Sequence, residues 1–340
     1  MQFVCKDCFA DKELKGFILS QGHIRDCDCC KNKEIETIAI EELLDFFKEL
    51  FDNFKVYPKG ASLLSSIQGN WSLFSNLECG RKILNFTLDK IGSAISNSEE
   101  LVDFSDDILE NVNYWFKLKE QLKWEKRYFT DINFLTDDLG WDSFFESKVT
   151  IKNEDVFYRA RLHQNADDEI FQTEKMYCPP AKNATAGRAN PIGIPYLYLS
   201  DNEETVLYEI RASYLDEVSL GIFSKENEIL TDVTISDFTE IASLYLPNEV
   251  NKRIKSTLLK QHISRDLSKP MRRYDSELDY IPTQFICEFI KVFTNVQGIK
   301  FRSSLDNIGN NLVIFNQDIM KCRSVKKVQI SKVKIKAIDL

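Results

Sequence analysis

Long hydrophobic runs are absent from this sequence, and glycine, proline and histidine are scarce in it. No apolar stretch approaches the roughly 18 residues that cross a membrane as a helix, and no basic segment followed by an apolar run opens the chain. We therefore expect a cytoplasmic protein that has no secretory signal and does not bind membranes. Only 12 glycines and 8 prolines occur in 340 residues, with 43% hydrophobic and 29% charged residues. That composition is typical of folded proteins and excludes disordered and fibrous classes.

An excess of positive charge is also lacking. The formal net charge is -9, which argues against a protein that coats nucleic acid through bulk electrostatics. Nucleic acid is therefore not expected as the main partner. The length of 340 residues exceeds that of one typical domain and predicts two or three compact units.

Nine cysteines are present, and five of them lie within the first thirty residues. Cys5 and Cys8 form one pair with two residues between them, Cys27 and Cys30 form another, and 18 residues separate the pairs. This spacing is typical of a four-cysteine zinc site, which is closed and structural because no ligand position stays open. Cys29 is an alternative to Cys30 as a ligand. The competing interpretation is a set of buried thiols without metal.

The pattern along the chain predicts three parts, an α+β architecture overall. Residues 1–34 form the four-cysteine zinc element, a ribbon or knuckle. Residues 35–147 form a helical domain, since apolar residues recur at helical spacing from Ile38 to Phe51. Residues 148–340 form a mixed β-sheet domain with helices, because short runs of period-two character begin after Trp141. Helices are expected at 201–212, 248–264 and 282–296, and strands at Val156–Arg161, Tyr196–Leu199, Val218–Phe223, Ile229–Val233, Ile299–Ser303, Leu312–Phe315 and Val325–Ile338.

Two arginines stand out in the first of these strands. Strand alternation places Phe157, Arg159 and Arg161 on one face. Two guanidinium groups pointing the same way can clamp a diphosphate by bidentate hydrogen bonds. Taken alone the signal is weak, since a strand with arginines facing water is the commoner arrangement.

A carboxylate and two serines follow in later segments. Ser200 with Glu203 three residues on predicts a capping box at the start of a helix, which places Glu209 in its third turn at the margin of an apolar face. Without further context Glu209 is an ordinary boundary residue. Ser303 and Ser304 would end the strand that begins at Ile299.

Taken together, these segments resemble the RES domain, a family named for an arginine, a glutamate and a serine. The segments that carry the resemblance are Phe157-Tyr-Arg159, Gly187-Arg-Ala-Asn-Pro191, Tyr196-Leu-Tyr-Leu-Ser200, Glu204-Thr-Val-Leu-Tyr-Glu209 and Gly298-Ile-Lys-Phe-Arg-Ser303. Five segments in the family's order make a chance likeness improbable. The cysteine pairs followed by helices are similar to the zinc-bearing, HEPN-related N-terminal segment of a subset of RES proteins.

The resemblance implies an ADP-ribosyltransferase-like fold and an enzyme that consumes NAD. Position by position, Arg159, Glu209 and Ser303 match the family's arginine, glutamate and serine, with Ser304 as an alternative register for the serine. Arg188 and Tyr198 match accessory positions near the NAD pocket. Arg161 and Asn190 are further candidates for substrate binding.

The chemistry that the resemblance implies suits these residue types. Breaking the nicotinamide–ribose bond builds positive charge on the sugar, which a carboxylate such as Glu209 stabilises. Arg159 would hold the pyrophosphate, Ser303 would position the ribose, and Tyr198 would stack on a ring. The sequence has no glycine-rich dinucleotide fingerprint, so NAD is expected as a substrate and not as a recycled cofactor.

The leading hypothesis is an NAD-degrading toxin or defence effector, of the toxin–antitoxin or anti-phage kind, that acts by hydrolysis or phosphorolysis. One alternative is an ADP-ribosyltransferase that modifies a protein or nucleic acid. Another is a non-enzymatic zinc-ribbon binding protein. An antitoxin or regulatory partner and a homo-oligomer are left open. The 35–147 region contains no histidine, which argues against RNA cleavage by an RNase-type HEPN domain.

Overall fold

The computed structural model describes residues 2–145, 148–165, 168–227, 229, 231–269, 277–305 and 308–333. The chain divides into two compact units. Unit 1 comprises residues 1–117 and 241–259. Unit 2 comprises residues 118–240 and 260–340. The first unit is therefore discontinuous in sequence, because a short segment inside the C-terminal half completes it.

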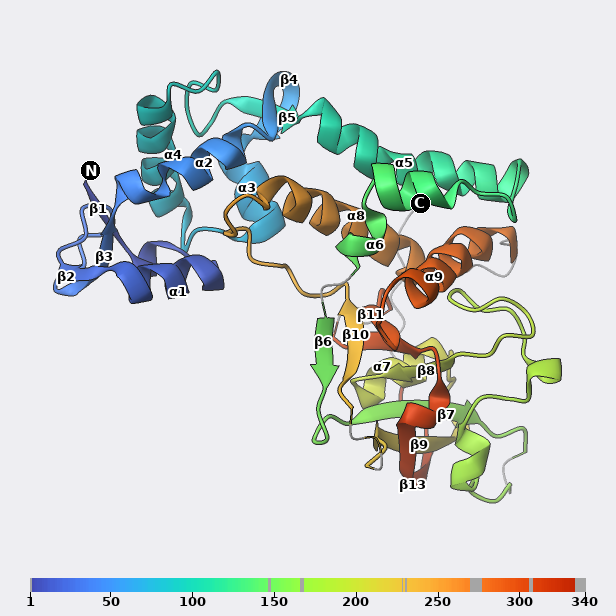
Figure 1. Ribbon diagram of the computed structural model, residues 1–340. Helices are drawn as coiled ribbons and strands as arrows, with labels where there is room; N and C mark the ends of the chain where they lie inside the picture. The colour runs from blue at the N-terminus through green and yellow to red at the C-terminus, as the bar shows by residue number, and fades with distance from the viewer. Residues whose placement is uncertain are drawn as a thin grey trace. The chain divides into compact units, whose positions relative to one another are not determined.

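Unit 1 combines helices with two small sheets. Its helices and strands are β1 (Phe3–Cys5), η1 (Lys6–Cys8), α1 (Lys12–Gln21), β2 (His23–Arg25), β3 (Ile35–Ala39), η2 (Ile40–Leu43), α2 (Leu44–Phe51), β4 (Phe54–Ser62), α3 (Leu63–Trp71), α4 (Leu77–Ile91), β5 (Leu101–Phe104), the first part of α5 (Asp106–Trp124) and the first part of α8 (Val250–Ser268). Strand β3 pairs antiparallel with both β1 and β2, and β4 pairs antiparallel with β5 (Figure 1).

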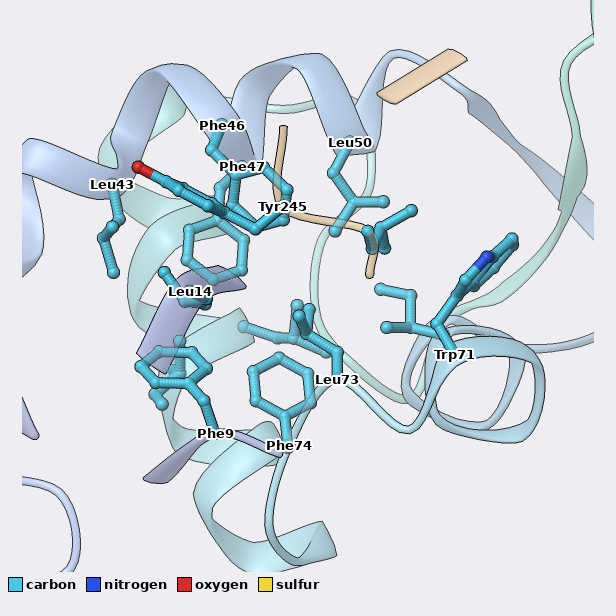
Figure 2. Close-up of a cluster of buried hydrophobic side chains, with 14 of the residues drawn as sticks. Phe9, Leu14, Leu43, Phe46, Phe47, Leu50, Trp71, Leu73, Phe74 and Tyr245 are labelled. Atoms are coloured by element: carbon cyan, nitrogen blue, oxygen red, sulfur yellow. The ribbon is translucent and has the colours of Figure 1, made fainter. Parts of the chain in front are cut away.

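Aromatic and aliphatic side chains fill the core of unit 1. Figure 2 shows Phe46 and Phe47 of α2 beside Tyr245, which belongs to the returning segment 241–259. The Phe46 and Tyr245 rings meet edge to face with centroids 5.1 Å apart, and the Phe9 and Phe74 rings lie 5.9 Å apart. Aromatic pairs in such geometries add to the free energy of area burial. The returning segment is therefore part of this core and not a loop on its surface.

The buried carboxylate of Asp11 ties this segment to the start of the chain. Oδ1 accepts the N–H of Leu14 and so caps helix α1. Oδ2 accepts the backbone N–H groups of Leu244 (2.6 Å) and Tyr245 (3.3 Å). Asp11 is 5% exposed. One side chain thus satisfies three backbone donors that would otherwise be buried without partners.

Unit 2 is built on a mixed sheet. Among the described residues it has eight strands in the order β13-β9-β7-β8-β12-β11-β10-β6. Most of them are labelled in Figure 1. Only β10 and β11 pair in parallel, and the other neighbours within the described sheet are antiparallel. Besides the second parts of α5 and α8, the elements are η3 (Phe134–Asp138), α6 (Trp141–Phe144), β6 (Lys148–Ile151), β7 (Phe157–Leu162), η4 (Thr173–Met176), η5 (Ala181–Asn183), β8 (Leu197–Ser200), α7 (Glu203–Glu209), β9 (Glu217–Lys225), β10 (Val233–Asp237), η6 (Glu277–Tyr280), α9 (Ile281–Phe293), β11 (Gly298–Arg302), β12 (Asn310–Ile314), η7 (Gln317–Ile319) and β13 (Met320–Gln329).

The short helix α7 packs against β7 and β8 at the centre of the sheet. Asn202, not Ser200, caps it: the Asn202 carboxamide oxygen accepts the N–H groups of Glu204 and Thr205. The predicted capping box was therefore wrong. Ser200 ends β8 and donates its hydroxyl to the carbonyl of Asn310 instead. Helix α7 spans only Glu203–Glu209, about two turns, so Glu209 is its last residue and does not lie in a third turn as predicted.

The predicted α+β class is confirmed, and most strands expected in the C-terminal half occur within a few residues of their predicted bounds. Three predictions fail. Ile35–Ala39 is a strand between β1 and β2, not the start of a helix; a strand lies at Val233–Asp237 and not at Ile229–Val233; and the strand expected at Val325–Ile338 is β13, which begins at Met320. Residues 334–338 of that last prediction lie outside the described residues. The pairing of β4 with β5 was not predicted.

The structure has two compact units. The predicted division of the chain into three parts at residues 34 and 147 stays a prediction. Within the described part of the chain, no helix combines the length and the apolar character that crossing a membrane requires.

Candidate functional site

A cavity of about 410 Å³ opens in unit 2 beside helix α7. This volume lies in the range typical of small-molecule sites. Its wall combines apolar side chains with a few polar ones contributed by separate elements. The polar and aromatic residues of the wall include Arg159, Arg188, Tyr198, Glu209, Tyr280 and Asn311.

Glu209 presents its carboxylate at the end of α7. Its Oε1 accepts a hydrogen bond from the hydroxyl of Ser303 (3.0 Å) and another from the side-chain amide of Asn311 (2.6 Å). Two donors on one oxygen fix the plane of the carboxylate. The chain leaves the helix through Arg211, whose φ of 55° is left-handed and ends the helix sharply. The carboxylate is therefore held by Ser303, which follows β11, and by Asn311 of β12 as well as by its own helix.

The two candidate serines have different partners. Ser303 is 3% exposed; besides bonding to Glu209, its Oγ accepts the backbone N–H of Leu305 (3.2 Å). Ser304 is exposed and donates its hydroxyl to the carbonyl of Ser268. Only Ser303 of this pair meets the carboxylate, which favours the Ser303 register.

Arg159 lies on β7 and lines the cavity. Its Nη1 is buried and has no hydrogen-bond partner among the described residues. Burial lowers the pKa of the guanidinium, and the nearby Cys178 partly opposes that effect. Arginine keeps its charge in proteins, so a buried N–H of this cation without an acceptor favours an anion as its partner.

Arg161 is placed differently from the prediction that paired it with Arg159. It does not line the cavity, and its Nη2 donates to the carbonyl of Tyr177 over 2.6 Å. The backbone carbonyl thus already holds one arm of this guanidinium. The structure does not bring Arg159 and Arg161 together on one cavity wall.

Tyr198 and Asn190 shape the loop that carries Arg188. The Tyr198 hydroxyl donates to Oδ1 of Asn190 (2.8 Å) and accepts the N–H of Ala189 (3.0 Å). Burial raises the pKa of the Tyr198 phenol, so it stays protonated as a donor. The Asn190 amide donates to the carbonyls of Thr185 and Pro191. Asn190 is therefore a loop residue that does not line the cavity, whereas Tyr198 does.

Gly187 is needed where this loop turns. A Cβ built there would lie 2.6 Å from Oδ1 of Asn190 and 2.7 Å from the Tyr198 hydroxyl. Any side chain would thus displace the bonds that order the loop. Arg188 then reaches the cavity, with Nη1 donating to the carbonyl of Asp266 (3.2 Å) and its guanidinium 5.8 Å from the centre of the Tyr280 ring.

Two site residues escaped the sequence analysis. Asn311 directly precedes the strand predicted at Leu312–Phe315 and was not predicted as a site residue, although its side-chain amide donates to Glu209. Tyr280 ends η6, a short helix for which the sequence gave no signal. Asn311 could have been found from strand pairing: it faces Ser200 on β8, so its strand lies beside the one that leads into α7.

The cysteine pairs converge in unit 1. The sulfur–sulfur separations are 3.8 Å for Cys5–Cys8, 3.4 Å for Cys5–Cys30 and 3.6 Å for Cys8–Cys27. Four sulfurs placed about 2.3 Å from a zinc ion lie about 3.8 Å from one another. The four thiols, which all lie within 4.8 Å of one another, therefore fit a tetrahedral ion and can hold a metal.

The protein thus has a mixed α+β fold, with a carboxylate, the serine that bonds it and two partly buried arginines gathered at one cavity. The family model described as the RES domain matches residues 156–334, more than half of the chain, and the chain belongs to the RES-domain family. RES domains are associated with toxins that use NAD. Neither the curated proteins nor the solved structures gave a match to the chain.

Proposed function

We propose that this protein is an NAD-consuming toxin or defence effector that breaks the nicotinamide–ribose bond by hydrolysis or phosphorolysis. The observation that carries the proposal is the Glu209 carboxylate, fixed by Ser303 and Asn311 at the wall of a cavity of about 410 Å³ that Arg159 also lines. Membership of the RES-domain family supports NAD as the substrate.

In this proposal Glu209 acts electrostatically. As nicotinamide leaves, the ribose gains oxocarbenium character, and a carboxylate already held in place stabilises that charge without reorganising. The interaction grows as the sugar becomes cationic, so it favours the transition state over bound NAD. Ser303 then acts through Glu209: its hydroxyl donates to the carboxylate and orients it beside the ribose.

Arg159 and Arg188 would bind the diphosphate of NAD. A buried cation with an N–H lacking an acceptor suits a phosphate oxygen, and Arg159 has such a group at Nη1. Both arginines line the same cavity as Glu209. The Tyr198 and Tyr280 rings, which also line it, would contact a base or the nicotinamide.

The metal in unit 1 is proposed to be structural zinc, held by Cys5, Cys8, Cys27 and Cys30. Four thiolates leave no open position for a substrate, so the ion would stabilise the fold and take no part in NAD cleavage. The HEPN-related character of residues 35–147 stays part of this proposal, as a sensing or docking role without RNA cleavage.

Product analysis tests the reaction. The full-length protein is incubated with NAD, with and without inorganic phosphate, and the products are identified by mass. Free nicotinamide with ADP-ribose means hydrolysis, and phosphate-dependent ADP-ribose phosphate means phosphorolysis. A mass increase on a protein or nucleic acid would favour the transferase alternative. Absence of nicotinamide under every condition, including with a restraining partner removed, would overturn the enzymatic proposal.

Growth of a bacterial host tests the biological role. An enzyme that drains NAD in the cytoplasm has to be restrained, so we propose an antitoxin or regulatory partner. Expression of the chain alone should arrest growth, and Glu209→Ala should relieve the arrest while the protein stays folded. An equally toxic, well-expressed Glu209→Ala protein would show that another carboxylate carries the activity.

A further inference from the structure

Two cysteines outside the four-cysteine site lie directly beside it. Cys29 sits between two of the ligands in sequence, and Cys79 lies in the first turn of α4. The thiols of Cys8, Cys29 and Cys79 all lie within 4.8 Å of one another. All three side chains are buried, with exposures of 0%, 1% and 4%. Cys8 therefore belongs to two groups of sulfur atoms at once.

The three thiols come from separate segments of unit 1. Cys8 ends η1, Cys29 belongs to the second cysteine pair, and Cys79 is 50 residues further along the chain. The backbone N–H of Cys79 donates to Oδ1 of Asn76, the cap of α4, which fixes the first turn of that helix. The Sγ of Cys29 lies 3.9 Å from the carbonyl oxygen of Cys79. Chain-distant thiols held this rigidly form a pre-arranged donor set.

The donor set has a defined chemistry. Three sulfurs around one ion with bonds of about 2.3 Å lie about 4.0 Å apart in a plane. Separations of at most 4.8 Å reach that geometry with side-chain shifts below about 1 Å. Thiolates select soft cations, and a site that offers three of them suits Cu(I) better than structural zinc, which takes four ligands.

The positive end of a helix lies beside these thiols. Cys79 is in the first turn of α4, where the helix dipole is positive. Nζ of Lys82, one turn further, lies 3.5 Å from the carbonyl oxygen of Cys29. Lys82 also pairs with Glu78 over 2.6 Å, so the helix dipole is the main feature that stabilises negative sulfur at this end of α4. Among the described residues, the group of three consists of cysteines alone.

We propose that Cys8, Cys29 and Cys79 form a second metal site for a soft cation, Cu(I), which shares the Cys8 sulfur with the four-cysteine site. A thiolate has lone pairs enough to bridge two ions, so the element would hold a zinc ion and a copper ion joined by one sulfur. The proposal does not depend on NAD chemistry and concerns only unit 1.

Metal loading of the full-length protein tests it. Zinc-loaded protein is given one equivalent of Cu(I) under anaerobic conditions, desalted, and analysed for both metals and for Cu(I)–thiolate charge-transfer absorption. We expect about one zinc and one copper per chain in the native sequence. Cys79→Ser should keep its zinc and bind no copper. Cys322→Ser is the matched control, since Cys322 is a buried thiol in unit 2, and it should bind both metals.

Three results would overturn the proposal. Copper that displaces zinc one for one shows a single site. Copper binding by Cys79→Ser equal to that of the native sequence shows that Cys79 is not a ligand. Loss of zinc from both Cys79→Ser and Cys29→Ser would mean that these residues only support the first site. Retained zinc in either variant reports that unit 1 is folded, so a lack of copper there is a loss of the site itself.

Discussion

The hydroxyl of Ser303 donates a hydrogen bond to Oε1 of Glu209 over 3.0 Å and so joins two residues 94 positions apart in sequence. Ser303 directly follows β11, and Glu209 is the last residue of α7. Asn311, from the neighbouring strand β12, bonds the same oxygen. The orientation of the carboxylate thus depends on Ser303 and Asn311, and changes at these two residues should affect turnover even where they do not touch a substrate.

Replacing Glu209 tests the charge of this carboxylate. Glu209→Gln keeps the size of the side chain but removes the negative charge that would oppose the cationic sugar. We expect kcat for NAD cleavage to fall about 100-fold or more, with little change in KM. Steady-state kinetics with nicotinamide release as the readout measures this. Glu204→Gln, an exposed change on the same helix, serves as control, and an equal fall there would contradict the assignment.

The adjacent serines offer a matched pair. Ser303→Ala removes a hydrogen bond to Glu209, and turnover should fall about tenfold, the value of one such bond. Ser304→Ala removes only a surface bond to the carbonyl of Ser268 and should leave turnover within about twofold. The reverse ranking of the two variants would place the family's serine at residue 304.

The two arginines of β7 are a second matched pair. Arg159→Lys keeps a charge but loses the planar fork that suits a diphosphate, so KM for NAD should rise on the order of tenfold. Arg161→Lys changes a side chain outside the cavity, bonded to the carbonyl of Tyr177, and should leave KM unchanged. Isothermal binding of NAD would check the same ranking without turnover. A larger effect at Arg161 would restore it as the diphosphate ligand.

Sequence patterns predicted most of the strands of unit 2 and the main residues of its candidate site. The five RES-like segments identified Arg159, Glu209 and Ser303, which the structure gathers near α7. A family motif identifies such residues in the sequence without any knowledge of their neighbours in the fold. The strand pattern could not separate Arg159 from Arg161. Both alternate onto one face, and only the fold shows that Arg159 lines the cavity while Arg161 donates to the carbonyl of Tyr177.

Unit 1 was harder to predict for the same kind of reason. Apolar spacing around Ile38 suits a helix, yet Ile35–Ala39 pairs with β1 and β2, a contact between segments that periodicity alone does not register. The cysteine spacing did anticipate the gathering of Cys5, Cys8, Cys27 and Cys30. It gave no sign of Cys79, because a single cysteine in a helix carries no spacing.

Removing the metal should affect the N-terminal unit first. With a strong chelator, or in Cys5→Ser, we expect the loss of one bound zinc and faster amide exchange in β1. The reason is that the backbone N–H groups of Gln2 and Phe3 donate to Asp28, which lies between the second pair of cysteines. NAD consumption by unit 2 should persist. Metal analysis and hydrogen exchange check this, and a metal-free protein with full protection in residues 3–30 would contradict it.

Asp11 provides a stability test for unit 1. Asp11→Ala removes the cap of α1 and leaves the buried N–H groups of Leu244 and Tyr245 without their acceptor. The free energy of unfolding should fall by about 2 kcal/mol or more. Chemical denaturation of the full chain measures it, and Asp45→Ala, an exposed change on α2, is the control. Equal stability of the two variants would show that Asp11 is dispensable.

The returning segment 241–259 also sets an order of events during synthesis. Tyr245 packs on Phe46, and Asp11 accepts the backbone N–H groups of Leu244 and Tyr245. The core of unit 1 therefore stays incomplete on the ribosome until most of unit 2 has been translated. Domains made N-terminal first normally fold as they emerge. Here the N-terminal part must remain open while the strands from β6 to β10 appear, which makes a nascent chain halted near residue 240 a natural target for chaperones and proteases.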